Sequence, residues 1–263
     1  MKARIAGAEI EYDVRGQGPV LLFLHAFPLG LFMWDAAAAD LARDHTVVRF
    51  DARGFGGSPT GDGPLSMERI ADDGAALLDH LDLGQAVVAG CSMGGYAAFA
   101  MVRRRPDRLR GLVLMNTRAT PDTPEGRASR ALLAEKVLKE GAAAAADSFL
   151  PRLLGETTKR DKPELVAALD ERIRRNPPRG IANALLGMGG RADSTPTLRE
   201  IRVPTLVIGG AEDAFTPPAD IEALARGIAG ARHLILPRSG HLPSLEAPEA
   251  LNQALHNFLG GRQ

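Results

Sequence analysis

Short apolar runs alternate with helical patterns along most of this 263-residue chain, and this alternation narrows its fold more than any other feature. The run Val20–Leu24 is continuously apolar and of strand length, which is typical of a strand covered on both faces. Further runs at 46–50, 86–89 and 111–115 are separated by helical patterns. Such alternation predicts an α/β fold, in which a parallel sheet carries helices on both faces.

The alternation stops after the first half of the chain. Residues 118–200 contain several helical patterns divided by prolines, and no convincing strand. The strand–helix pattern resumes with the apolar run 203–208 and continues to the last helical pattern. We therefore predict a core domain formed by residues 1–117 and 201–263, with residues 118–200 inserted between two strands as a helical cap.

The charge balance and the cysteine count limit the partners of this chain. Its 32 basic and 32 acidic residues cancel, so no bulk field favours nucleic acid or an anionic membrane. A single cysteine excludes an internal disulfide and is compatible with a reducing compartment. We see neither an apolar signal segment nor a run long enough to span a membrane. We expect a cytoplasmic protein without nucleic-acid or membrane partners, whose oligomeric state is open and compatible with a homodimer.

The sequence Gly90-Cys91-Ser92-Met93-Gly94 joins a β-branched run to a helical pattern. A serine hydroxyl becomes a useful nucleophile where a tight turn pushes its oxygen out of the backbone, towards a base. Glycines at both ends of the motif permit such a turn, because a side chain there would collide with the neighbouring strand or helix. The motif and its position between strand and helix predict that Ser92 is a nucleophile.

An acid and a histidine follow two later strands. Asp213 comes soon after the run 203–208, and His241 soon after 233–236. The carboxyl ends of parallel strands meet at one edge of a sheet, so both side chains are expected near Ser92. His241 would take the serine proton and later give it to the leaving group, while Asp213 would hold the imidazole in the right tautomer.

Two backbone amides complete the predicted site. Phe27 lies in the loop after the first buried strand, and Met93 begins the helix that follows Ser92. Their N–H groups would bind the oxyanion that develops on the substrate, and the N-terminus of that helix adds a partial positive charge.

Alternative assignments have simpler structural explanations. For the acid, Glu212 is adjacent but would point elsewhere, and Asp220 lies inside the next helix. The position after strand 111–115 holds Asn116 and Thr117 rather than a carboxylate. Among the histidines, His25 ends a strand and is interpreted as bracing a loop. Cys91 is interpreted as a small buried apolar residue, not as a catalytic group.

In the order serine, acid, histidine, with the turn at 90–94 and a helical insertion, the chain resembles the α/β-hydrolase superfamily. The segment His25-Ala26-Phe27-Pro28 is similar to the family's His-Gly oxyanion loop, with alanine in place of glycine. The segment 51–58 is similar to its Asp-x-Arg-Gly-x-Gly-x-Ser turn. Small bacterial carboxylesterases and 3-oxoadipate enol-lactone hydrolases are the most similar members. The resemblance implies a mostly parallel sheet of about eight strands with a helical cap.

These residues predict a serine hydrolase that cleaves a small or medium carboxylic ester through an acyl-enzyme. The alternatives that share the chemistry are hydrolysis of 3-oxoadipate enol-lactone or another lactone, carbon–carbon bond hydrolysis and perhydrolysis. A non-catalytic ligand-binding protein of the same fold is the alternative from another class. The chain has neither metal-ligand spacing nor a dinucleotide motif, so we expect no metal and no cofactor.

The insertion is expected to roof the site and to set its specificity. A mostly apolar pocket would favour small or medium acyl and alkyl groups. The apolar residues expected to line it are Phe27, Phe32, Met93, Phe149, Leu186, Met188, Phe215 and Leu242.

Overall fold

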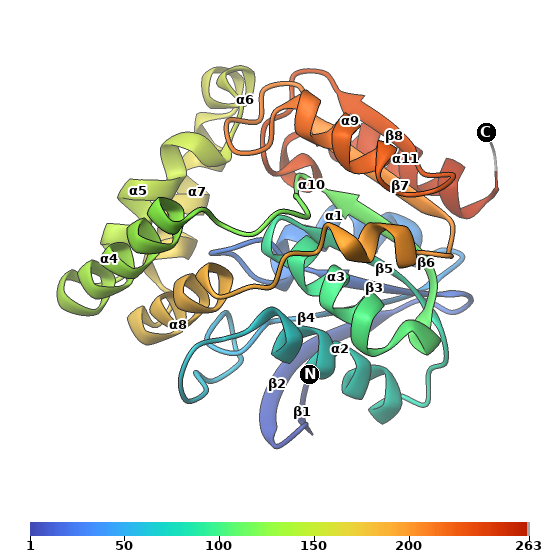
Figure 1. Cartoon of the computed structure of the whole chain (residues 1–263), viewed down its shortest axis with the longest axis horizontal. Helices are drawn as coiled ribbons and strands as arrows, with labels where there is room; N and C mark the ends of the chain where they lie inside the picture. The colour runs from blue at the N-terminus through green and yellow to red at the C-terminus, as the bar shows by residue number, and fades with distance from the viewer. Residues whose placement is uncertain (262–263) are drawn as a thin grey trace.

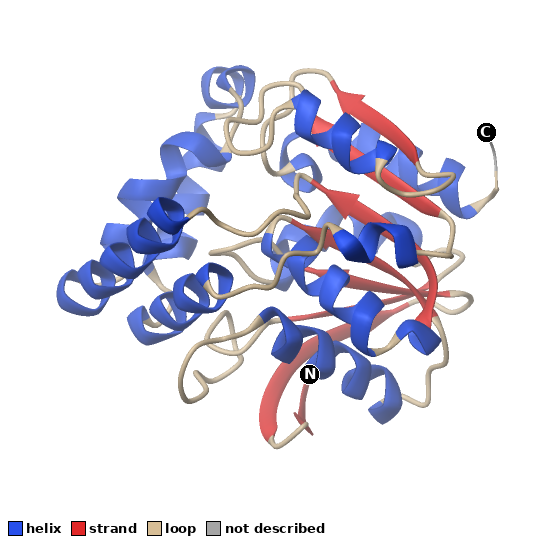
Figure 2. Ribbon diagram, viewed as in Figure 1, coloured by secondary structure: helices blue, strands red, loops and turns tan. Residues whose placement is uncertain are grey.

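The computed structural model describes residues 1–261, which form one eight-stranded sheet in the order β1-β2-β4-β3-β5-β6-β7-β8. The strand pairs β1–β2 and β2–β4 are antiparallel, and the other pairs are parallel (Figure 2). In chain order the strands are β1 (Lys2–Ile5), β2 (Ala8–Arg15), β3 (Val20–Leu24), β4 (Thr46–Phe50), β5 (Ala86–Cys91), β6 (Leu109–Met115), β7 (Thr205–Gly210) and β8 (Arg232–Leu236).

Helices cover both faces of the sheet, as the alternation predicts. One face carries α2 (Met67–His80), α3 (Met93–Arg104) and α9 (Pro218–Arg226), whose buried side chains belong to one hydrophobic cluster. The other carries α1 (Asp35–Leu41) and α11 (Pro248–Leu259), which belong to a second cluster. The α/β fold is therefore confirmed.

A few elements differ from the sequence-based expectation. β1 was not predicted, because it has only four residues, of which Ile5 alone is buried. The helical pattern after β3 begins with the 3-10 turn η1 (Leu31–Trp34) before α1. A short helix, α10 (Pro243–Glu246), precedes α11. The 3-10 turn η2 (Pro106–Arg108) leads into β6.

The chain between β6 and β7 is helical. It forms α4 (Pro124–Glu140), α5 (Ala143–Leu153), α6 (Glu156–Asp161), α7 (Pro163–Arg174), α8 (Pro178–Gly189) and the 3-10 turn η3 (Pro196–Glu200). Figure 1 shows α4, α5, α7 and α8 together at the end of the sheet towards which the parallel strands run. No helix within residues 1–261 is long and apolar enough to cross a membrane.

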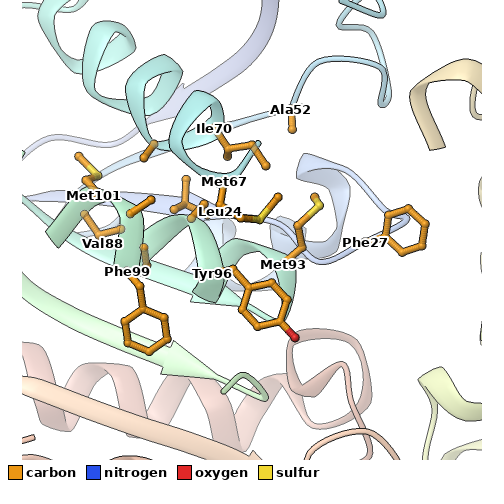
Figure 3. Close-up of a cluster of buried hydrophobic side chains, with 14 of the residues drawn as sticks. Leu24, Phe27, Ala52, Met67, Ile70, Val88, Met93, Tyr96, Phe99 and Met101 are labelled. Atoms are coloured by element: carbon orange, nitrogen blue, oxygen red, sulfur yellow. The ribbon is translucent and has the colours of Figure 1, made fainter. Parts of the chain in front are cut away.

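Apolar packing fixes α3 against the sheet. Figure 3 shows Met93, Phe99 and Met101 of α3 in one cluster with residues of α2 and of the central strands. All three side chains are at most 1% exposed, so moving the helix would open cavities in the core. This packing sets where α3 begins, and therefore where the preceding residue, Ser92, lies.

Candidate active site

Ser92 occupies a sharp turn between β5 and α3. Its backbone has φ 51° and ψ −110°, a region that a residue with a side chain adopts only when its surroundings enforce it. Its N–H donates to the carbonyl of Met115 on the neighbouring strand β6 at 2.9 Å. Ser92 lines a cavity at this edge of the sheet. The turn therefore presents the serine to the cavity, as the motif predicts.

The two motif glycines are required by close backbone approaches. A Cβ atom at Gly90 would lie 2.2 Å from the carbonyl oxygen of Gly94 in α3. One at Gly94 would lie 2.1 Å from the carbonyl oxygen of Leu24 in β3. These are the helix and strand collisions that the sequence argument anticipates, and they explain why the motif needs glycine at both positions.

His241 and Asp213 are joined by a hydrogen bond beside the same cavity. The imidazole Nδ1 lies 2.8 Å from Oδ2 and 3.0 Å from Oδ1 of Asp213. An ionised carboxylate only accepts, so Nδ1 carries a proton and donates it. His241 lines the cavity together with Ser92, and its Nε2 is left as the basic nitrogen.

The surroundings of Asp213 keep it ionised. Burial opposes the charged form, but His241, the Thr216 hydroxyl and the Phe215 N–H at 2.8 Å outweigh burial and bring the pKa of Asp213 down from 3.8 to about 2. The Asn116 side-chain amide also donates a hydrogen bond to Asp213, at 2.6 Å. The acid therefore remains an anion in any neutral solution.

Asn116 contacts the candidate acid but was not predicted as part of the site. It follows β6 with a positive φ of 46°, and its amide donates both to Asp213 and to the carbonyl of Gly240 at 3.1 Å. In the sequence, the only feature recognised at the position after β6 was that it holds no carboxylate. The available signal was an amide at the carboxyl end of β6, the strand that neighbours the one carrying Asp213.

Two backbone N–H groups at this edge of the sheet have no hydrogen-bond partner among the described residues. Within residues 1–261, the N–H groups of Phe27 and Met93 contact no hydrogen-bond acceptor. Phe27 follows β3 in the loop that lines the cavity, and Met93 is the first residue of α3. Both donors are thus available to a ligand, and their role in binding an oxyanion stays a prediction.

Neighbouring polar residues brace the loops around the site. The ring of His25 accepts from the Ala52 N–H through Nε2 at 3.0 Å, which leaves Nδ1 to donate to the Ala26 carbonyl. Complete burial lowers the pKa of His25, so it is a neutral bracing residue, as expected. Asp51 accepts from the Leu31 N–H at 2.7 Å and from the next turn, at Gly57 N–H.

Cys91 precedes Ser92 but is held in the core. It is fully buried, and its thiol lies 3.6 Å from the carbonyl oxygen of His241. Burial, followed by the charges of Asp213 and Glu246, raises the pKa of this thiol well above 9. A neutral buried thiol is a poor nucleophile, which agrees with its interpretation as an apolar residue.

The cavity has a volume of about 430 Å³. Residues of the loops that follow the strands and residues of the helices between β6 and β7 both line it. Three predicted lining residues besides Phe27 are among its walls, namely Phe149, Met188 and Phe215. The complete lining is Phe27, Ser92, Tyr96, Arg118, Asp122, Gly126, Ser129, Arg130, Leu133, Ser148, Phe149, Arg152, Leu153, Leu185, Met188, Phe215, Thr216 and His241.

Four predicted lining residues lie elsewhere, and those predictions are wrong. Leu242 and Met93 have side chains buried in the two hydrophobic clusters. Leu186 is 39% exposed on α8, where its neighbour Leu185 faces the cavity instead. Phe32 lies under the guanidinium of Arg172, 4.1 Å from its ring centroid. Helical periodicity showed which residues share a face but not which face meets the site.

The expectation of a mostly apolar pocket is also wrong. Arg118, Arg130 and Arg152 line the cavity, together with Asp122 and several hydroxyl groups. In the sequence these arginines are indistinguishable from those on solvated helix faces. Only the tertiary structure brings Arg118 of the loop after β6, Arg130 of α4 and Arg152 of α5 to one cavity.

Two carboxylates fasten this helical region to the loops that carry Asp213 and His241. Buried Glu246 accepts from the N–H groups of Gly240 and Leu242, on either side of His241, and from that of Gly155, at 2.8–2.9 Å. Three backbone donors satisfy its charge inside the protein. Glu246 therefore connects the loop that carries His241 to the loop between α5 and α6.

Glu212 is the second of these carboxylates. It accepts from the N–H and hydroxyl of Thr157 at 2.8 and 2.6 Å. In addition, the N–H of His241 donates to the carbonyl of Leu153 at 3.3 Å. Neither the loop from Leu153 to Thr157 nor these carboxylates were recognised as part of the site, because such long-range contacts leave no mark in local sequence patterns.

This chain is similar to known proteins over almost its whole length. A family model described as the α/β hydrolase fold matches residues 19–248. A thermophilic esterase from Thermogutta terrifontis, solved with malate bound, superposes with a TM-score of 0.96 at 41% identity, covering 99% of this chain and 98% of that one. The chain therefore belongs to the α/β hydrolase family.

Two curated relatives are enzymes named for esters or lactones. The 3-oxoadipate enol-lactonase 2 of Acinetobacter baylyi is 31% identical, with 94% of this chain and 91% of that protein aligned. The pimeloyl-[acyl-carrier protein] methyl ester esterase of Neisseria meningitidis is 30% identical, with 90% and 92% aligned. This chain is accordingly a hydrolase of the family.

Proposed function

We propose that this protein hydrolyses carboxylic esters through an acyl-enzyme formed on Ser92. The observation that carries the proposal is the shared cavity: a strained serine and a histidine bound to an ionised aspartate line or border the same 430 Å³ space. The esterases among its relatives support the same reaction class.

In the proposed mechanism, Ser92 attacks the ester carbonyl while His241 Nε2 takes its proton. Asp213 keeps the ring in the tautomer with Nδ1 protonated and stabilises the imidazolium that forms. The N–H groups of Phe27 and Met93 bind the oxyanion. His241 then protonates the leaving alcohol, and water repeats the sequence on the acyl-enzyme to release the acid.

We propose that residues 118–200 act as a cap over a core formed by residues 1–117 and 201–263. The supporting observation is that α4, α5 and α8 contribute cavity walls opposite Ser92, whereas strand-end loops contribute the reacting groups. A cap of this kind excludes water from the reaction and shapes the space for the substrate.

Lactone hydrolysis is the second candidate. A lactone is an internal ester, so the same nucleophile, base and oxyanion donors would open it. The specific support is the 31% identity to an enol-lactonase over 94% of this chain. The leaving hydroxyl would remain attached to the acyl group until water releases both.

Steady-state hydrolysis of 4-nitrophenyl acetate and butyrate by the wild type and by Ser92→Ala tests the proposal. We expect turnover by the wild type and a loss of about 10⁴-fold or more in the variant. Cys91→Ala provides a matched control, because it changes the adjacent side chain outside the reaction. Equal activity of Ser92→Ala and wild type would refute the serine mechanism. A parallel screen of lactones compares the two candidate substrates.

A further inference from the structure

The walls of the cavity carry an excess of positive charge. Asp122 is the only carboxylate among the described residues that line it, against three arginines. Asp122 is already paired, with Arg130 at 2.5 Å and with Arg191, behind the wall, at 2.7 Å. Although burial opposes its ionisation, these two cations lower the pKa of Asp122. No unpaired carboxylate among the described lining residues is therefore left for Arg118 and Arg152.

Arg152 has no carboxylate partner within residues 1–261. Its guanidinium lies over the ring of Phe215, 4.2 Å from the centroid, and reaches the carbonyl of Ala214 at 3.5 Å. The stacking orients the guanidinium, while most of its donors remain unused. An oriented guanidinium with free donors is suited to bind an anion.

Arg118 approaches the same residue from the loop after β6. It donates to the carbonyl of Phe215, and its one acidic neighbour is Asp220, 3.5 Å away. Both side chains of that pair are partly exposed, at 38% and 43%, so the pair is weak. Arg118 and Arg152 are therefore both held at Phe215, one at its carbonyl and one at its ring.

Phe215 also contacts the base. Its ring centroid lies 4.8 Å from that of His241, and the two residues border the cavity together. A single aromatic ring thus separates the guanidinium of Arg152 from the imidazole. An anionic group bound there would lie a short chain away from an ester carbonyl placed at Ser92.

We propose that Arg118 and Arg152 form a carboxylate-binding subsite, and that the preferred substrate is an ester or lactone whose acid part ends in a free carboxylate. This inference rests on the proposed function, because it places the subsite relative to Ser92. The carboxylate accepts hydrogen bonds from the two guanidinium groups. The Arg152 guanidinium lies 4.2 Å from the Phe215 ring centroid, which lies 4.8 Å from the imidazole centroid, so only a few carbons would separate the bound carboxylate from the ester.

Arginines elsewhere in the proposed cap provide a comparison, because they are paired with acidic residues outside the cavity. Arg174 and Arg175 form ion pairs with acidic residues of their own helix, one turn earlier. Neither lines the cavity. Arg118 and Arg152 differ in both respects, since they line the cavity and lack a strong acidic partner there.

A matched pair of substrates tests the subsite. Mono-(4-nitrophenyl) glutarate carries the free carboxylate, and its methyl ester has the same chain without the charge. We expect the wild type to favour the charged ester in kcat/KM, and Arg152→Gln and Arg118→Gln each to lower the charged-to-neutral ratio about tenfold. Added salt should lower the ratio for the wild type, because the subsite is partly exposed.

The control is Arg172→Gln, which removes a cap arginine that packs on Phe32 outside the cavity. It should leave the charged-to-neutral ratio unchanged. A ratio near one in the wild type, or an equal ratio in Arg152→Gln, Arg118→Gln and the control, would overturn the subsite while leaving ester hydrolysis intact. Failure to hydrolyse either ester would instead contradict the proposed function. The ratio is measured within each variant, so a partial loss of folded protein does not alter it.

Discussion

The carboxyl edge of the sheet and the helices between β6 and β7 border one cavity, but they are constructed differently. At the sheet edge, Ser92, Asp213 and His241 each follow a strand whose register is set by backbone hydrogen bonds. The helical region contributes Arg152 and Phe149 from α5, whose position depends on side-chain packing and on a few contacts with the core.

This difference in construction suits the sheet edge to holding the proposed reacting groups, and the helical region to selecting the substrate. The sheet positions atoms through many cooperative hydrogen bonds, so the reacting groups can be held within narrow limits. The helical region rests on the sheet through contacts such as those of Glu212 and Glu246, and its wall residues can change without disturbing the strands. We expect substitutions at the sheet edge to abolish turnover or folding, and substitutions in the helices to redirect specificity.

Asp213→Asn should have the largest effect on turnover. The amide can donate to His241 Nδ1, which favours the wrong tautomer, so kcat/KM for 4-nitrophenyl butyrate should fall about 10³- to 10⁴-fold. Glu222→Gln on the exposed face of α9 is the control and should behave like the wild type. Retention of more than a tenth of the activity by Asp213→Asn would show that the sheet edge tolerates change as the helices do.

Gly94→Ala should destabilise the core strongly. Alanine favours helices, yet its Cβ would lie 2.1 Å from the Leu24 carbonyl, so strand and helix must separate. We expect a loss of about 3 kcal/mol in the free energy of unfolding, or no folded protein. Gly84→Ala, where a Cβ meets nothing within 4 Å, should change the free energy by less than about 0.5 kcal/mol. Similar urea midpoints for the two variants would contradict this prediction.

Lowering the pH should reduce the free energy of unfolding by protonating Asp213 at the sheet edge. Its pKa in the folded protein is about 2, below the ordinary 3.8, so its ionisation stabilises the fold above pH 3.8. That stabilisation, about 2 kcal/mol, is lost as the pH falls from 3.8 towards 2. The difference in unfolding free energy between wild type and Asp213→Asn, measured in urea at each pH, should shrink over that window. Parallel curves would rule out this contribution.

Glu246→Gln and Glu212→Gln compare the two attachments of the helical region. Glu246 binds the N–H groups on both sides of His241, so its amide variant should leave buried donors unpaired and lower kcat about tenfold. Glu212 holds only Thr157, and its variant should change kcat by less than about threefold. If both variants affected kcat equally, fastening the helices, rather than positioning the base, would explain the effect of Glu246.

Much of the sheet and its edge could be predicted because their signals are local. An apolar run such as Val20–Leu24 is enough to predict a buried strand. Parallel pairing then brings the carboxyl ends of the strands to one edge of the sheet. Ser92 was recognisable from the glycines around it. Asn116 was not, because an asparagine after a strand is equally suited to a turn, and its bond to Asp213 joins residues 97 positions apart.

The amino-acid order alone determined the α/β architecture, the turn at Ser92 and the likeness to a family, because each depends on periodicity or on steric limits within a few residues. Tertiary structure alone decided the character of the cavity. Whether Arg152 reaches Phe215 and the cavity depends on how α5 is oriented against the core, and the orientation of α8 likewise places Leu185 rather than Leu186 at the wall. Such orientations arise from packing across the whole molecule, which no local pattern encodes.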